Sequence, residues 1–130
     1  MRPALLKAYR ATGYEVAGID IRIGRRCPAM DRLLQSFDVR EAAFVTAWNP
    51  LSRVMPPGWN RRMQVRLVLA ARRRPVLAGR GSWRCWSEAH LIVFGDARPS
   101  RQLARRFRQN GIVTVRLRQC ARLVVVFGMA

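Results

Sequence analysis

The sequence is poor in several residue types, and each shortage excludes a class of site. It has a single histidine, His90, so a metal site built from several imidazoles is excluded. The three cysteines lie far apart and form no CxxC pair, which argues against a zinc site or a disulfide scaffold. No phosphate-binding P-loop, dinucleotide fingerprint or serine nucleophile elbow is present. We therefore predict no metal, no cofactor and no catalytic residue.

Long apolar runs, internal repeats and low-complexity linkers are also absent. No uncharged stretch reaches the ~18 apolar residues that a membrane helix needs. The opening apolar stretch is broken by Lys7 and is too short for a secretory signal. Since the chain has 130 residues, half of them hydrophobic, we expect one domain over residues 1–130. We expect a soluble cytoplasmic protein with no membrane partner, and nothing in the sequence indicates a homo-oligomer.

Acidic residues are few, with seven against 25 basic residues and a net charge of +18. Such a charge attracts polyanions such as nucleic acid. Lys7 is the only lysine, so the other 24 basic residues are arginine. Because arginine codons are rich in G and C, genome composition is an alternative source of this excess. Both explanations stay open at this point.

The apolar pattern predicts an α+β fold. Helical periodicity favours helices over 3–10, from Pro28, and from about Asn60 to Arg74, and Ser100 is expected to cap a fourth, which Asn110-Gly111 closes. Strand-like runs occur at 14–23 (a hairpin turning at Ala17-Gly18), 42–48, 76–83 (an edge strand weakened by glycines), 90–95 and 112–127 (a hairpin). We expect a mixed or antiparallel sheet of about five to seven strands with three to four helices packed on it. The strand order is not predicted.

Arginines recur at helical spacing on two of the predicted helices. Like charges at i and i+4 repel, and neither helix carries a carboxylate of its own, so an anionic partner would relieve the repulsion. We predict polyanion binding, to nucleic acid or a ribonucleoprotein surface, through Arg62, Arg66, Arg72, Arg73, Arg74, Arg101, Arg105 and Arg108. No recognised nucleic-acid-binding motif accompanies them.

The stretch FVTAWNPLSR, residues 44–53, ends an apolar run abruptly at Asn49-Pro50. Proline restricts the preceding residue, so Asn49 is expected to be extended and to hydrogen-bond its own turn. A second hypothesis places amide and hydroxyl side chains around one cleft, with Glu88 as its ionisable group. The cleft candidates are Trp48, Asn49, Ser52, Asn60, Glu88, His90 and Gln109. Glu88 and His90 alternate onto the same face of a predicted strand.

Four short motifs occur together in order: AWNPLS at 47–52, Asn60 at a helix start, WSE at 86–88 and FRQN at 107–110. This set resembles the bacterial family known as domain of unknown function 3293, from about Tyr9 to the last strand. The resemblance implies a small α+β fold and no assigned activity. Two positions depart from the pattern, because His90 replaces a small hydroxyl residue and Arg108 replaces a glycine.

Three functions follow as expectations. The first is polyanion binding through the arginine helix faces, by a domain that we expect to be non-enzymatic. The second is a small-ligand-binding or hydrolytic cleft. The third is protein–protein interaction through the closing stretch RLVVVFGMA, residues 122–130, if it lies at a sheet edge.

Overall fold

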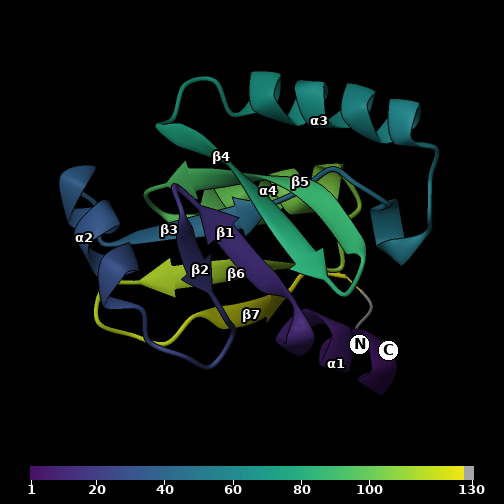
Figure 1. The fold of residues 1–130 in the computed structure, drawn as a ribbon. Coiled ribbons are helices and arrows are strands. Elements are labelled where there is room, and N and C mark those ends of the chain that lie inside the picture. The colour runs from purple at the N-terminus through teal and green to yellow at the C-terminus, as the bar shows by residue number, and fades with distance from the viewer. Residues whose placement is uncertain (128–130) are drawn as a thin grey trace.

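The computed structural model describes residues 1–127, and the elements follow one another in the predicted order (Figure 1). The four α-helices are α1 Pro3–Ala11, α2 Pro28–Ser36, α3 Pro57–Ala70 and α4 Ala97–Arg106. The strands are β1 Gly13–Val16, β2 Ile19–Ile21, β3 Glu41–Val45, β4 Val76–Trp83, β5 Trp86–Phe94, β6 Gly111–Arg116 and β7 Arg122–Val125. A short 3-10 turn, η1 Pro50–Ser52, lies between β3 and α3.

All seven strands join one antiparallel sheet in the order β2-β1-β4-β5-β3-β6-β7, which confirms the α+β prediction. The sheet curls until its two ends touch. An isolated parallel bridge joins Ile23, after β2, to Ala121, before β7. Gly24 N donates to Ala121 O at 2.8 Å, and Ala121 N donates to Arg25 O at 3.1 Å. Each edge strand is therefore partly covered near this bridge.

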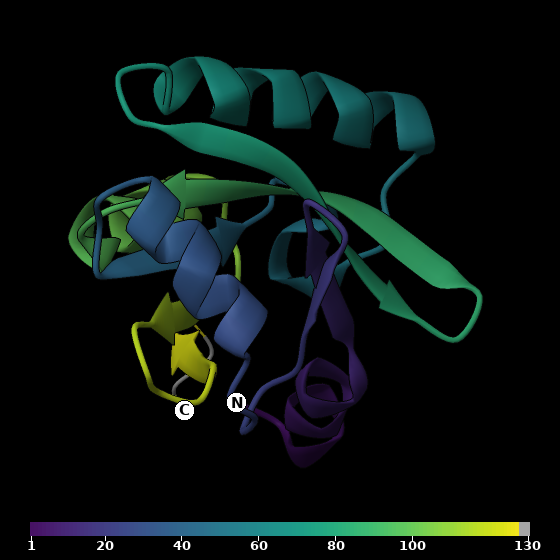
Figure 2. The same cartoon turned by 60° about the vertical axis from the view of Figure 1, so that its left-hand side comes forward.

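Each face of the curled sheet has its own hydrophobic cluster. On one face Tyr14, Phe44 and Ile92 pack against Leu34 of α2. On the other, residues such as Val93 pack against α3 and α4. Figure 2 shows α1 and α2 on the inside of the curl and α3 outside it. Strand β3, buried from Ala42 to Val45, carries apolar residues for both clusters, as its two-sided apolar sequence predicts.

The prediction that residues 76–83 form an edge strand is wrong. Strand β4 lies between β1 and β5, and its two glycines make this position close-packed. A Cβ atom on Gly79 would lie 2.6 Å from Glu15 O, and one on Gly81 would lie 2.6 Å from His90 Cε1. The glycines therefore allow neighbouring groups to approach the strand, and they do not weaken an edge.

Both predicted ends of α4 are corrected. Asp96 is the N-cap, with its side chain accepting from Arg98 N at 2.8 Å, whereas Ser100 is buried inside the helix. The helix ends at Arg106, before Asn110-Gly111. Arg108 then adopts a left-handed conformation with φ of 54°. This conformation gives a physical reason for the glycine that the family resemblance places there.

The predicted interaction stretch, residues 122–130, lies partly outside the described residues. Strand β7 does occupy an edge of the sheet and pairs antiparallel with β6. Residues 128–130 are not described.

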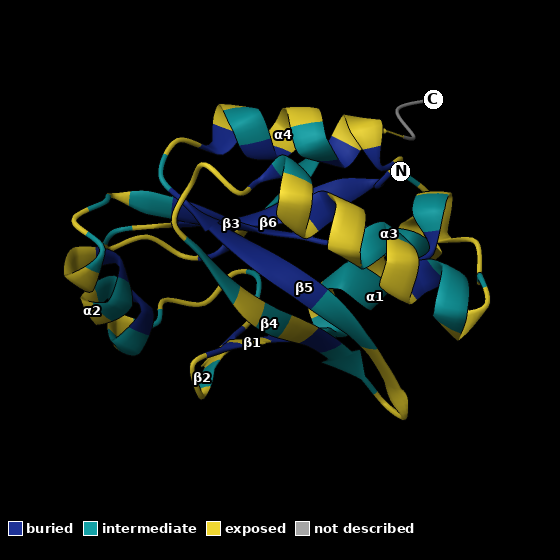
Figure 3. Cartoon of the chain, turned by 90° about the horizontal axis from the view of Figure 1, so that it is seen from above, coloured by how far each residue is buried: buried dark blue, intermediate teal, exposed yellow. Residues whose placement is uncertain are grey.

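Figure 3 shows that the buried residues concentrate in the central strands, and that exposed residues dominate the outer surfaces of α3 and α4.

Candidate ligand-binding pocket

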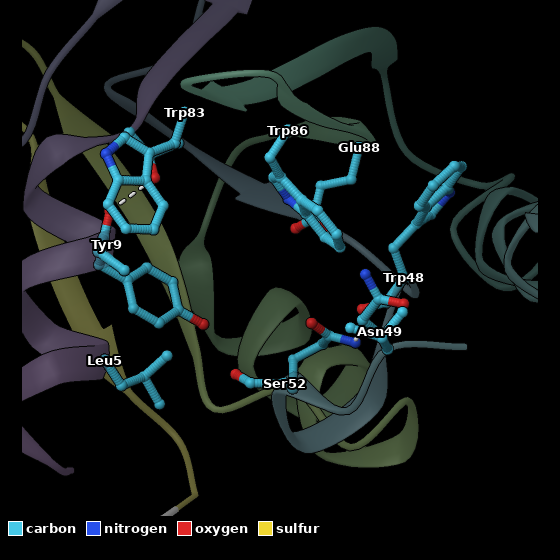
Figure 4. Close-up of a pocket in the computed structure, with 12 residues that line it drawn as sticks. Leu5, Tyr9, Trp48, Asn49, Ser52, Trp83, Trp86 and Glu88 are labelled. Carbon is cyan, nitrogen blue, oxygen red and sulfur yellow. Dashed lines mark hydrogen bonds between the residues drawn. The ribbon is translucent and has the colours of Figure 1, made fainter. Parts of the chain in front are cut away.

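A cavity of about 270 Å³ lies between α1, the loop after β3, the β4–β5 hairpin and the residues after α4. We call it the Glu88 pocket. One wall consists of Leu5, Ala8 and Tyr9 of α1 with Thr12 just after it, the loop supplies Trp48, Asn49, Ser52 and Val54, and the remaining wall consists of Trp83, Trp86, Glu88 and Gln109. Figure 4 shows the side chains of Tyr9, Trp86, Glu88 and Asn49 arranged around this space.

The loop after β3 has an unusual backbone, and the expected extended Asn49 is wrong. Asn49, Leu51 and Ser52 all have positive φ, at 48°, 53° and 62°. Left-handed conformations cost roughly 1 kcal/mol for residues other than glycine, and asparagine tolerates them best. Tertiary hydrogen bonds outweigh the local preference of a residue before proline. One of them runs from Leu51 N to Arg108 O at 2.7 Å.

The buried side chain of Asn60, at the start of α3, fixes this loop. Its Oδ1 accepts from Asn49 N at 3.0 Å, and its Nδ2 donates to Asn49 Oδ1 at 2.9 Å and to Met55 O at 3.2 Å. Asn60 is only 2% exposed and does not line the pocket. It therefore acts as a positioning residue behind the wall.

The same network leaves one polar group of Asn49 without a partner. Asn49 Oδ1 accepts from both Met55 N and Asn60 Nδ2, so the orientation of the amide is determined. Asn49 is 6% exposed, and its Nδ2 has no acceptor within hydrogen-bond distance among residues 1–127, although it is near enough to the Glu88 carboxyl group to lower the pKa of that acid. A buried, unsatisfied donor of this kind is costly and calls for an explanation. In Figure 4 the nitrogen points into the pocket, toward Glu88.

Glu88 is the carboxylic acid of the pocket. Burial raises its pKa from the ordinary 4.5 to about 7, and the polar groups of Trp86 and Asn49 offset part of that rise. Glu88 has no arginine partner among the described residues, unlike Asp31, Glu41 and Asp96. Near neutral pH the carboxyl group therefore accepts hydrogen bonds when ionised and donates one when protonated.

His90 lies behind Glu88 and does not line the pocket. Its ring meets Tyr14 and Phe44 edge-on, with centroid distances of 5.6 and 6.4 Å. Because the Glu88 carbonyl can only accept, its 3.3 Å contact assigns the proton to His90 Nδ1. Burial lowers the pKa of His90 to about 4, so the 4.0 Å approach of Nε2 to Glu88 Oε1 is no ion pair at neutral pH.

The other predicted cleft residues reach the pocket in different ways. Gln109 Nε2 donates to Trp48 O at 3.1 Å and to Phe107 O at 3.2 Å, which ties the end of α4 to the loop. Ser52 accepts from Asn110 Nδ2 at 2.8 Å. The Trp48 ring also borders an apolar groove on α3, and in Figure 4 it lies on the far side of Asn49 from Tyr9. Thus five of the seven candidates line one cavity, while Asn60 and His90 lie behind it.

Three aromatic lining residues, Tyr9, Trp83 and Trp86, were not among the cleft candidates. The sequence does contain a pattern that could have indicated the wall formed by α1, because Leu5, Ala8, Tyr9 and Thr12 recur at the spacing of one helix face. No local signal separates Trp83 and Trp86, at the tip of a hairpin, from core tryptophans. Trp86 is 40% exposed, and Arg84 Cζ lies 4.8 Å from the centre of the Trp83 ring.

The eight candidate arginines are all exposed, and two of them line one groove. A groove between α3 and α4 collects Arg66 and Arg72 together with Arg106, which was not predicted. Arg106 Cζ also lies 5.6 Å from the centre of the Phe107 ring. The remaining candidates do not line this groove: Arg62, Arg73, Arg74, Arg101, Arg105 and Arg108.

Among residues 1–127, no group of three His, Cys, Asp or Glu side chains gathers in a way that could hold a metal ion. No helix in this part of the chain has the length and apolar character needed to cross a membrane.

The structure thus defines a small α+β protein with a curled antiparallel sheet and an aromatic-walled pocket beside it. The chain belongs to the family described as protein of unknown function (DUF3293), whose model matches residues 45–112. This segment is shorter than the resemblance suggested. It contains every lining residue of the Glu88 pocket except those of α1 and Thr12. Comparison with curated proteins and with solved structures finds no match.

Proposed function

We propose that the protein binds a small molecule in the Glu88 pocket. The observation that carries this proposal is the buried Asn49 Nδ2, which has no acceptor within hydrogen-bond distance among residues 1–127 and points toward Glu88, an acid without a cationic partner whose pKa it lowers. Ligand sites typically combine apolar walls with a few convergent polar groups of this type. Tyr9, Trp83 and Trp86 supply the walls.

A binding role agrees with the chemistry of the pocket better than catalysis does. Glu88 has a pKa of about 7, which would suit a general base. The pocket holds no cysteine or lysine, and its one serine is exposed in a strained loop with no histidine beside it in the lining. We therefore assign Glu88 and Asn49 to ligand recognition.

Benzamide is a suitable probe, because its ring matches the aromatic walls and its amide offers both a donor and an acceptor. We expect a dissociation constant in the roughly millimolar range for so small a molecule. Titration followed by NMR should shift the Asn49 side-chain NH₂ signals together with the Trp86 indole signal. Toluene, which lacks the amide, should leave the Asn49 signals unchanged. Benzamide binding that moves neither signal would refute the proposal.

A second candidate function is polyanion binding in the groove between α3 and α4. It is favoured by Arg66 of α3, Arg72 just after α3 and Arg106 of α4, which line one groove and form no ion pair with the described acidic residues. Phosphate contacts by such a group release counterions, so affinity falls steeply as salt rises.

The test is anisotropy titration of labelled single-stranded and duplex nucleic acids, with heparin as the control polyanion. Replacing Arg66 and Arg106 together by Gln should weaken binding. It should also reduce the slope of log affinity against log salt concentration by about two, because two phosphate contacts are lost. The paired substitution Arg26→Gln and Arg118→Gln removes the same charge from another surface and should weaken binding less. Equal losses in the two double variants would show that net charge alone drives binding.

A further inference from the structure

The lining of the Glu88 pocket restricts the chemistry of its ligand. Although the chain has 24 arginines, none lines this pocket, and neither does the lysine or the histidine. A phosphate or carboxylate group would therefore meet only an acid and neutral groups there. The ligand must instead offer donors to the Glu88 carboxylate and, beside them, an acceptor to Asn49 Nδ2. Its body must be apolar enough to contact aromatic side chains.

We infer that the Glu88 pocket takes a guanine-type base, held by Glu88 and Asn49 along its Watson–Crick edge and stacked on Trp86. This inference rests on the proposed function and specifies its ligand. Guanine presents two adjacent N–H donors and, next to them, the O6 acceptor. The donors match the two oxygens of the carboxylate, and O6 matches Asn49 Nδ2, which has no acceptor within hydrogen-bond distance among residues 1–127.

The aromatic residues fit the same ligand. Bases that leave a helical stack are commonly bound on aromatic rings while their edges are hydrogen-bonded. Trp86 belongs to the pocket wall and remains partly open to solvent, while Tyr9 stands across the cavity on α1. The volume of about 270 Å³ lies at the small end of ligand pockets, which suits one base with its sugar outside.

Adenine does not complement this arrangement. Its N6 amino group would place a donor against Asn49 Nδ2, and its N1 would place an acceptor against the ionised Glu88. A site that hydrogen-bonds its ligand rejects an analogue that leaves buried polar groups unpaired. We therefore expect guanosine to bind at least tenfold more tightly than adenosine at pH 8.

The affinity for guanosine should depend on pH through Glu88. Its titratable neighbours are His90 from β5, Tyr9 from α1 and Tyr14 from β1. Burial lowers the pKa of His90 to about 4 and raises that of Tyr9 to about 12. Burial also raises the pKa of Tyr14 well above its usual range. Only Glu88 among these groups titrates between pH 5 and 8. Guanine requires the ionised carboxylate. The affinity for guanosine should therefore rise about tenfold for each pH unit below pH 7 and stay constant above it.

The experiment measures binding of guanosine, inosine, 1-methylguanosine and adenosine at pH 5.5, 7 and 8 by tryptophan fluorescence, with Asn49 side-chain NMR signals as a second readout. The expected order at pH 8 is guanosine first, then inosine, which lacks one donor, then adenosine. 1-Methylguanosine should not bind, because its methyl group blocks the central donor. Adenosine binding as tight as guanosine binding, or an affinity independent of pH, would overturn the inference.

Two variants test the assigned residues. Glu88→Gln keeps the shape of the side chain but removes one acceptor, so guanosine affinity should fall at least tenfold and lose its pH dependence. Trp86→Leu keeps an apolar side chain without a stacking surface, and a loss of about tenfold is expected by NMR. Arg80→Gln, on strand β4 of the same hairpin and outside the pocket lining, is the control and should change the affinity less than twofold. An unchanged affinity in Glu88→Gln would contradict the inference.

The outcome also separates this inference from the proposed function. If benzamide shifts the Asn49 signals and guanosine does not bind, the pocket binds ligands but the base assignment is wrong. If neither binds, both fail. A tetranucleotide with one guanine then identifies the source of the base. Affinity equal to that of guanosine indicates a free nucleoside, and tighter, salt-sensitive binding indicates a single strand; either result supports base binding.

Discussion

Glu88→Gln is expected to raise the free energy of unfolding by about 3 kcal/mol at pH 8 and to change it little at pH 4. The reason is the burial of an acid without a cationic partner. The folded protein holds the Glu88 proton up to a pKa of about 7, whereas the unfolded chain loses it near 4.5. The neutral glutamine removes this cost.

The direction in which the free energy of unfolding changes with pH follows from the number of protons that the folded and unfolded states bind. Below pH 4.5 both states carry the proton, and Glu88 costs nothing. Between pH 4.5 and 7 the folded state binds more protons than the unfolded state, so stability falls as pH rises. Above pH 7 both states are ionised, and the full cost remains. The difference between variant and parent should therefore grow through this window and then stay constant.

Urea unfolding of parent and variant at several pH values measures this difference. His90 titrates in an overlapping range with the opposite sign, but it is present in both proteins and cancels in the comparison. The matched control is Glu15→Gln, on the exposed side of β1, with an expected change within about 0.5 kcal/mol. A Glu88→Gln effect of the same size at pH 4 and pH 8 would show that burial does not raise the pKa.

Asn60→Ala is expected to lower the free energy of unfolding by about 3 kcal/mol. The substitution removes three hydrogen bonds and leaves the buried Asn49 N–H without an acceptor. It also frees a loop that has positive φ at Asn49, Leu51 and Ser52. We expect the Asn49 amide to lose its hydrogen-exchange protection and benzamide binding to disappear.

The control for Asn60→Ala is Gln64→Ala, one turn further along α3. Gln64 Oε1 accepts from Ala47 N at 3.0 Å, so this change removes one hydrogen bond to the same segment. It should cost about 1 kcal/mol. If Asn60→Ala costs no more than this in urea unfolding, Asn60 does not hold the loop as we describe.

The sequence predicts the kind and order of the elements because each carries its own periodicity. The strand order depends on pairs such as Tyr14 with Gly81, which are distant in the sequence and leave no local pattern. Local rules also misplace single residues. The rule for a residue before proline fails at Asn49, where the Asn60 side chain holds another conformation. Capping statistics alone do not choose between Asp96 and Ser100.

The candidate site shows the same division. Asn49, Ser52, Glu88 and Gln109 come from motifs that are recognisable in the sequence, and they line one cavity. The opposite wall, with Tyr9, comes from a helix that precedes β1. Its placement depends on how the sheet curls, which short motifs do not encode. Arg106 likewise joins the α3–α4 groove only because two helices meet on one face.

The sheet order has a consequence for folding kinetics. Three hairpins, β1–β2, β4–β5 and β6–β7, pair strands that are neighbours in the sequence, and they can form early. Strand β3 has no such neighbour. It pairs only with β5 and β6, across long stretches of chain, and β1 must likewise find β4.

Such distant pairings slow folding to milliseconds or seconds, because chain entropy is lost before the contacts form. The rate should therefore be set by the docking of preformed hairpins onto β3. The Glu88 pocket draws its walls from α1, the loop after β3, the β4–β5 hairpin and the end of α4. The pocket is complete only when these docking steps are finished. The rate at which ligand-binding ability returns during refolding would therefore report the rate of the last docking step.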